Sequence, residues 1–188
     1  MKKITVLISG TGTNLKALID NCANQNIPAE IVQVIADRDC VGKKYAIEKN
    51  IPFSLIDRKL DAEIFQREII KQIPKDIDLI VCAGFLSVIP DGLIDLFPDK
   101  IINLHPSLLP EFGGIGMYGI KVHQAVIQAG KKISGATVHK VNKTVDGGEI
   151  LAQEKVAVLD GDTAEILQKR IAPIETALLI NTVKKLII

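Results

Sequence analysis

Residues 101–110, which read IINLHPSLLP, carry the strongest structural signal in the chain. Their first half is typical of a strand, in which alternate side chains project to one side, so Asn103 and His105 are expected on the same face. Pro106 favours extended dihedral angles at His105 and keeps this alternation to the end of the strand. An amide beside an imidazole here indicates a ligand site, since sites in α/β folds open where strands end. The alternative is a strand end with two solvated polar residues.

Strand and helix patterns alternate on the N-terminal side of this stretch. Short apolar, β-branched runs predict strands over residues 3–9, 31–36, 52–56 and 79–83. Amphipathic spacing predicts helices over residues 15–23, 42–49, 61–73 and 91–96. We therefore predict an α/β fold with a mostly parallel twisted sheet and helices on both of its faces.

The C-terminal side has a different pattern. A Gly-rich loop over residues 111–119 precedes a predicted helix over residues 120–130. Two alternating stretches predict strands over residues 133–141 and 149–158. We interpret these two strands as an antiparallel pair added to the edge of the parallel sheet.

A final amphipathic helix is predicted to run towards Ile187. Asp162 and Glu165 have the spacing of a capping box, which predicts the start of this helix. Pro173 is expected to break or kink it, because proline lacks the N–H that an inner helical turn needs. The sequence contains no internal repeat or linker, so we interpret residues 1–188 as a single domain.

The composition is that of a globular protein. The net charge is +1 and Trp is absent, so neither nucleic acid nor a charged membrane surface is indicated as a partner. No apolar run approaches the roughly 20 residues that cross a bilayer, and the one near the N-terminus is too short for a signal peptide. The cysteines are odd in number and far apart, which predicts reduced thiols and a cytoplasmic location: Cys22, Cys40 and Cys82.

A glycine turn, Gly10-Thr11-Gly12-Thr13-Asn14, joins the first predicted strand to the first helix. Such a turn presents backbone N–H groups and a helix N-terminus to an anion. The dinucleotide fingerprint requires Gly or Ala where Leu15 stands, although Asp37 lies at a suitable distance for a ribose. The nucleoside-triphosphate motif is absent too. The turn therefore predicts a phosphate monoester site at Gly12, Thr13 and Asn14, and the alternative is a helix capped by Thr13.

Asp146-Gly147-Gly148 is either an ordinary hairpin turn or a carboxylate directed at the site. An aspartate close to His105 would favour the imidazolium and orient the ring, as a general acid requires. Of the other histidines, His123 falls in a predicted helix and is interpreted as structural. His139 falls in a predicted strand and is interpreted as a supporting residue.

Four motifs together resemble the phosphoribosylglycinamide formyltransferase family, the folate-dependent transformylases of purine synthesis. They are residues 9–15 with the glycine turn, Ala83-Gly84-Phe85, residues 103–110, and Gly135-Ala136-Thr137-Val138-His139 through Asp146-Gly147-Gly148. The resemblance covers essentially the whole chain, in order and at suitable spacing. It implies the formyltransferase fold.

The resemblance also implies a role for each matching residue. Asn103, His105 and Asp146 match the family's catalytic trio. The turn that holds the substrate phosphate is matched by Gly12, Thr13 and Asn14, and the acidic residue that contacts the ribose is matched by Glu175. Residues 1–100 then form a phosphate-binding half of the domain, and residues 101–188 form a catalytic and folate-binding half.

The implied folate site has two parts besides Asn103. The segment that lines the pterin pocket is matched by Leu86, Ser87, Val88 and Ile89. The loop that closes over the ring is matched by Asn142, Lys143, Thr144, Val145 and Asp146. Three departures from the family pattern concern the ribose and folate contacts: Lys140 in place of an aromatic residue, Ser87 in place of the Arg of some members, and Ala172-Pro173 in place of more polar residues.

The implied reaction is attack of the phosphoribosylglycinamide amine on the formyl carbon of 10-formyltetrahydrofolate. Asn103 and protonated His105 stabilise the oxygen, and Asp146 assists His105. The expected partners are these two small molecules, with no nucleic acid and no membrane, and no metal is required. We expect a monomer or a homodimer.

Three other functional classes share parts of this pattern. The hydrolase of 10-formyltetrahydrofolate shares the trio but resembles this chain plus an N-terminal regulatory domain, for which we expect no room before the glycine turn. Methionyl-tRNA formyltransferase carries a C-terminal RNA-binding domain, which we do not expect after the last predicted helix. A non-enzymatic phosphate- or nucleotide-binding module would explain the glycine turn but would leave Asn103, His105 and Asp146 without a purpose.

Overall fold

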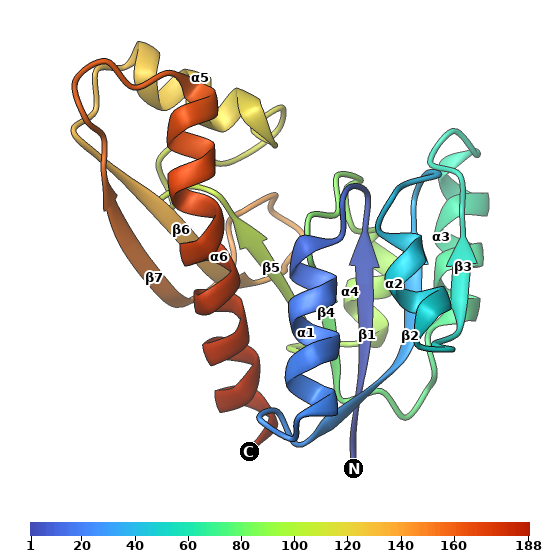
Figure 1. Ribbon diagram of the computed structural model, residues 1–188. Helices are drawn as coiled ribbons and strands as arrows, with labels where there is room; N and C mark the ends of the chain where they lie inside the picture. The colour runs from blue at the N-terminus through green and yellow to red at the C-terminus, as the bar shows by residue number, and fades with distance from the viewer.

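The computed structural model of the protein describes residues 1–188 and contains one mixed sheet of seven strands (Figure 1). The strand order is β3-β2-β1-β4-β5-β6-β7. The strands are β1 Lys2–Ile8, β2 Ala29–Ala36, β3 Phe53–Leu55, β4 Leu79–Cys82, β5 Ile101–His105, β6 Ile133–Lys140 and β7 Ile150–Ala157. The predicted α/β fold is confirmed.

The pairing changes from parallel to antiparallel at β5. Strands β1 to β5 pair in parallel, whereas the pairs β5–β6 and β6–β7 are antiparallel, as predicted. β1 lies between β2 and β4, so the strand order reverses direction at this point in the sheet. In α/β sheets such a reversal opens a crevice beyond the carboxyl ends of the strands.

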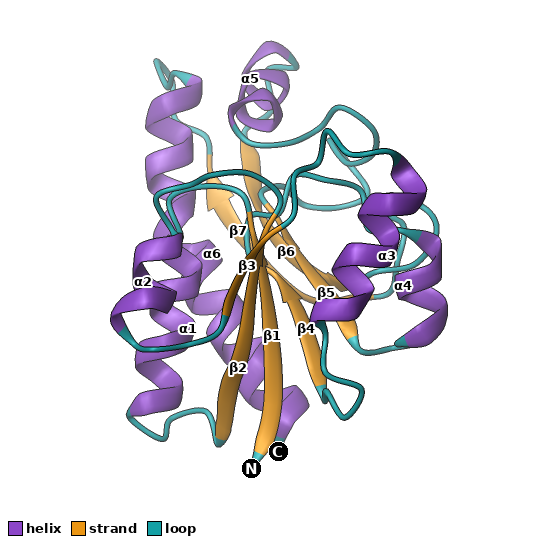
Figure 2. Ribbon diagram, turned by 90° about the vertical axis from the view of Figure 1, so that its right-hand side faces the viewer, coloured by secondary structure: helices purple, strands orange, loops and turns teal.

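Helices cover both faces of the sheet (Figure 2). They are α1 Thr13–Ala23, α2 Lys43–Glu48, α3 Ala62–Gln72, α4 Asp91–Leu96, α5 Ile120–Gln128 and α6 Ala164–Ile187. Helices α1, α2 and α6 lie over one face and share the larger apolar core with it, and α3 and α4 lie over the other face. The central strands are therefore buried on both sides, which explains their continuous apolar runs. None of the helices is long and apolar enough to cross a membrane.

Pro173 does not end the last helix. α6 is one helix of 24 residues with Pro173 inside it, so of the expected break or kink the break does not occur. The proline donates no hydrogen bond to the carbonyl of Lys169, but both residues are exposed and water can reach that carbonyl. Buried side chains on both sides of the proline hold the helix against the core, namely Leu167, Ile171, Leu179 and Val183.

The start of α6 also differs from the predicted capping box. Thr163 is the N-cap, and its hydroxyl accepts a hydrogen bond from Ile166 N. Asp162 instead forms an ion pair with Arg170 and accepts a hydrogen bond from Leu159 N. The prediction is wrong because Arg170, two turns further along the helix, binds the carboxylate.

Asp37 follows β2 and is fully buried. Its carboxylate accepts hydrogen bonds from Arg38 Nε and Nη2 at 2.9 and 2.8 Å and from Ser87 Oγ at 2.6 Å. Burial raises the pKa of Asp37, but these hydrogen bonds outweigh that effect and the net pKa shift is downward. The ionised side chain therefore ties the end of β2 to the loop after β4 and is not available to a ribose.

Asp37→Ala is expected to lower the free energy of unfolding by about 3 kcal/mol, because it leaves the partly buried charge of Arg38 without its partner. Urea unfolding would show this as a lower midpoint with an unchanged slope. Asp39→Ala is the matched control, since Asp39 pairs with Lys43 at an exposed position and should hardly move the midpoint. Equal effects of the two variants would contradict an anchoring role for Asp37.

Candidate active site

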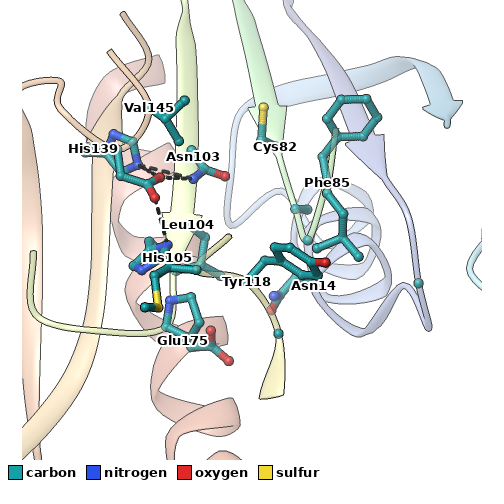
Figure 3. A pocket seen from close by; sticks show the side chains of 18 of the residues that line it. Asn14, Cys82, Phe85, Asn103, Leu104, His105, Tyr118, His139, Val145 and Glu175 are labelled. Carbon is teal, nitrogen blue, oxygen red and sulfur yellow. Dashed lines mark hydrogen bonds and ion pairs between the residues drawn. The ribbon is translucent and has the colours of Figure 1, made fainter. Parts of the chain in front are cut away.

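A cavity of about 890 Å³ lies beyond the carboxyl ends of β1, β4 and β5 (Figure 3). Both halves of the chain contribute to its wall. The contributing segments are the glycine turn, the loop after β4, the end of β5, the Gly-rich loop before α5, the β6–β7 loop and one side of α6. Every site residue predicted from the sequence lies in this wall.

The antiparallel pair β5–β6 brings an amide and an imidazole together. Asn103 lies opposite His139 in the register of the two strands. His139 Nδ1 lies 2.8 Å from the carbonyl oxygen of Lys140, which can only accept, so Nδ1 carries the proton and Nε2 is left as an acceptor. Asn103 Nδ2 lies 3.2 Å from that Nε2. His139 therefore orients the Asn103 amide, in keeping with its interpretation as a supporting residue.

Asp146 reaches this pair from the β6–β7 loop, with a left-handed backbone at φ 55°. Oδ1 lies 3.5 Å from both His139 Nε2 and Asn103 Nδ2. Oδ2 lies 3.5 Å from His105 Nδ1 and accepts a hydrogen bond from Gly114 N at 2.9 Å. Burial raises the pKa of Asp146, but its contacts outweigh that effect and the net pKa shift is downward. The carboxylate is therefore ionised and directed at the site.

The two ring nitrogens of His105 have different partners. Nε2 lies 2.8 Å from the carbonyl oxygen of Phe112, so Nε2 carries a proton in the neutral ring. Nδ1 faces Asp146 and gains the second proton when the ring becomes cationic. Burial lowers the pKa of His105, and the Asp146 charge and the Phe112 carbonyl oppose this shift without cancelling it. Proton uptake and release at His105 therefore take place at Nδ1.

The glycine turn presents donors to the cavity at the start of α1. No side chain caps this helix, so the alternative of a Thr13 cap is wrong. Gly12 adopts φ 76°, and a Cβ there would lie 2.6 Å from Gly42 Cα, so the two glycines meet backbone to backbone. The N–H groups of Gly12, Thr13 and Asn14 are among those that have no acceptor inside the protein. Such a set of donors suits an anion.

The loop after β4 lines another part of the cavity. Leu86 and Val88 expose apolar side chains there, and Ile89 is buried. Ser87 lines the cavity too, but its hydroxyl donates to Asp37 and is not free for a ligand. This wall is therefore largely apolar.

Residues 142–146 also line the cavity. Lys143 in this loop forms an exposed ion pair with Asp95 of α4 at 2.8 Å. Lys140, the departure from the family pattern just before the loop, pairs with Asp99 and Glu149 at 3.1 and 2.8 Å. Its ammonium group is thus engaged at the surface.

Glu175 and His123 also line the cavity. Glu175 of α6 is half-buried, and burial raises the pKa of its carboxyl to about 7. His123 of α5 is buried, and burial lowers the pKa of its imidazole to about 4, so the ring is neutral near pH 7. Nothing in these contacts contradicts the interpretation of His123 as structural.

Sequence reasoning gave no role to the Gly-rich loop, yet this loop contacts two members of the trio. Phe112 binds His105 through its carbonyl, and Gly114 binds Asp146 through its N–H. A Cβ on Gly113 would lie 2.5 Å from Leu109 Cδ2 and 3.2 Å from Asp146 Cβ, so a larger residue here would have to displace the Leu109 side chain and would crowd Asp146. The cluster of glycines was the signal in the sequence, but it did not indicate that the loop contacts His105 and Asp146.

Asp146→Asn is expected to lower the pKa of His105 further, because the variant lacks the negative charge that opposes the effect of burial. An NMR titration of the His105 ring measures this shift. Asp99→Asn, which removes an exposed charge beside Lys140, is the control and should leave the His105 titration unchanged. An unchanged or higher pKa of His105 in Asp146→Asn would contradict the coupling.

Known proteins are similar in sequence to this chain over nearly its whole length. The formyl transferase family model matches residues 2–183. Phosphoribosylglycinamide formyltransferase, chloroplastic, of Arabidopsis thaliana is 38% identical over 187 residues, which cover 97% of this chain and 64% of that protein. This chain therefore spans only part of the plant relative. The phosphoribosylglycinamide formyltransferase of Haemophilus influenzae is 39% identical over 176 residues, which cover 90% of this chain and 80% of that protein.

Solved structures share the fold as well. The crystal structure of phosphoribosylglycinamide formyltransferase from Bacillus halodurans superposes with a TM-score of 0.91 at 31% identity, covering 98% of this chain and 95% of that one. Glycinamide ribonucleotide transformylase 1 from Symbiobacterium toebii superposes with a TM-score of 0.90 at 34% identity, covering 98% and 86%. The resemblance carried by the four sequence motifs is thus confirmed, and the chain belongs to the formyl transferase family.

Proposed function

We propose that the protein transfers the formyl group of 10-formyltetrahydrofolate to the amine of 5′-phosphoribosylglycinamide, a step of purine (IMP) biosynthesis. The names of its relatives support this reaction. The observation that carries the proposal is that Asn103, His105 and Asp146 line the same cavity as the unpartnered N–H groups at the start of α1. A protein that only binds phosphate would need the N–H groups but not Asn103, His105 and Asp146.

The first step is attack of the amine on the formyl carbon, which places negative charge on the formyl oxygen. Asn103 Nδ2 and the imidazolium of His105 are the donors that stabilise this oxygen. His105 acts through Nδ1, because Phe112 holds Nε2. The contact of Nδ1 with Asp146, at 3.5 Å, is longer than a strong hydrogen bond and leaves the Nδ1 proton able to bind the substrate oxygen.

Asp146 favours the cationic form of His105, because its ionised carboxylate faces Nδ1. Collapse of the tetrahedral intermediate breaks the bond between the formyl carbon and the folate nitrogen. The proton lost by the attacking amine reaches that nitrogen through His105 or through a water molecule beside it. The products are the formylated ribonucleotide and tetrahydrofolate, and these steps require neither a metal nor a redox group.

The two substrates occupy different parts of the cavity. The phosphate binds the N–H groups of Gly12, Thr13 and Asn14, and the ribose hydroxyls donate to Glu175. The pterin ring lies between residues 86–89 and residues 142–146. The single domain divides into a phosphate-binding half, residues 1–100, and a catalytic and folate-binding half, residues 101–188. The first half also supplies one wall of the folate pocket.

Asn103→Ala and His105→Ala are each expected to lower the rate of formyl transfer by about 10²–10³, because each removes one donor to the developing oxyanion. The absorbance change on forming tetrahydrofolate, with phosphoribosylglycinamide present, measures this rate. Circular dichroism and thermal unfolding of both variants check that the fold is retained.

The same assay separates transfer from hydrolysis. Positioning of the amine can contribute about 7–11 kcal/mol to lowering the barrier, so formate release without phosphoribosylglycinamide should be slow. Formate release as fast as transfer would assign the protein to the hydrolases instead.

The KM for phosphoribosylglycinamide is expected to fall as pH rises through about 7, the pKa of Glu175. Below this pH the carboxyl is protonated and accepts ribose hydroxyls poorly, and above it the carboxylate accepts them well. Ionisation of one such group predicts a KM at pH 6 about tenfold higher than at pH 8. Glu175→Gln has no titrating group and should lose this part of the pH dependence. A pH dependence of KM identical in the two proteins would rule out Glu175 as its source.

A further inference from the structure

Thr176 lies on α6, next to Glu175, and contacts the glycine turn. Its Oγ1 donates a hydrogen bond of 2.7 Å to Asn14 Oδ1. We propose that Thr176 is a positioning residue for the substrate phosphate, because it holds the Asn14 amide with its NH₂ end free for the anion. This inference rests on the proposed function, since it adds a residue to the proposed phosphate site.

The orientation of Asn14 matters because the two ends of its amide are nearly equal in size and opposite in polarity. The oxygen end repels an anion, whereas the NH₂ end donates hydrogen bonds to it. Shape alone cannot select between the two orientations. A donor placed against the oxygen end can, and Thr176 is that donor.

The hydroxyl of Thr176 is diverted from the bond that a helical threonine ordinarily makes. Threonines inside helices commonly donate to the carbonyl four residues earlier. Thr182 on the same helix does so, at 2.8 Å from Leu178 O. The corresponding distance from Thr176 to Ala172 O is 3.2 Å, longer than its 2.7 Å contact with Asn14. Since a hydroxyl has one proton, the shorter contact to Asn14 takes it.

The packing of α1 against α6 makes this contact a fixed one. Leu15 and Leu18 of α1 belong to the same buried cluster as Leu179 and Val183 of α6. Glu175 and Asn14 both line the cavity, where Figure 3 draws them. One turn of α6 therefore acts on two parts of the same substrate in the proposed complex. Glu175 contacts the ribose, and Thr176 acts on the phosphate by orienting the Asn14 amide.

Thr176→Val removes the hydroxyl while keeping the shape of the side chain. We expect the KM for phosphoribosylglycinamide to rise about 2- to 10-fold, the range for one neutral hydrogen bond, with kcat and the KM for 10-formyltetrahydrofolate unchanged. Thr176→Ser keeps a hydroxyl and should restore the KM. Inorganic phosphate serves as a second probe, and its Kd, read from the NMR shifts of the glycine-turn amides, should rise by the same factor.

Two controls separate positioning from a structural effect. Thr182→Val removes a buried hydroxyl from the same helix and should leave both the KM and the phosphate Kd unchanged. In an Asn14→Ala background, Thr176→Val should have no further effect on either quantity, because the amide that it orients is gone. Thermal unfolding of each variant confirms that the fold is intact.

Several outcomes would overturn the role of Thr176. These are an equal rise of both KM values, failure of Thr176→Ser to restore binding, or an effect of Thr176→Val that persists without Asn14. An unchanged KM and phosphate Kd in Thr176→Val, with a raised KM in Asn14→Ala, would reject Thr176 and leave the proposed function standing. If the unmodified protein fails to use phosphoribosylglycinamide while Thr176→Val still weakens phosphate binding, the proposed function fails and the role of Thr176 stands.

Discussion

A carboxylate that is largely withdrawn from water needs donors or a cation beside it, and two separate segments supply them to Asp146. β5 supplies the Asn103 amide, and also His105 Nδ1 when that ring is protonated, and the Gly-rich loop supplies the N–H of Gly114. None of these segments can move far without leaving the charge unpaired. The groups proposed to react are therefore held in place before any substrate arrives, which is the condition for electrostatic stabilisation of a transition state.

The position of β5 in the sheet explains why the site forms there. It is the strand at which parallel pairing with β4 gives way to antiparallel pairing with β6. Its carboxyl end borders the crevice that the parallel strands open, and its other edge places Asn103 directly opposite His139. A strand with parallel neighbours on both sides would have the crevice but not this close opposition of side chains.

Local patterns were enough to predict most of the architecture. The apolar runs that became β1, β2 and β4 are buried on both faces, and burial of that kind leaves a continuous signal in the sequence. The shared side of Asn103 and His105 followed from strand periodicity alone. The start of α6 was placed at Asp162 because the pattern of a capping box is local, whereas the partner of that carboxylate, Arg170, lies further along the chain.

Contacts between segments that are far apart in the sequence are not predicted by any local pattern of this kind. Thr176 and Asn14 are separated by 162 positions, and neither residue type is unusual where it stands. The encounter of Gly114 with Asp146 depends on how two loops fold over the sheet, and a run of glycines only permits it. Pro173 is a related case, because propensity opposes a helix there and burial of the flanking apolar residues overrides it.

The contact between Gly12 and Gly42 limits how the proposed phosphate pocket can change in size. Two loops touch there through their backbones, so no side chain stands between them that a substitution could trim. Point mutations can therefore crowd this side of the pocket but cannot enlarge it. Space for a larger anion, such as a diphosphate, would have to come from an insertion in one of the loops, and loops tolerate added length at a small entropic cost. If the pocket binds phosphate as proposed, selectivity for anion size on this side depends on loop length, which evolves by insertion and deletion.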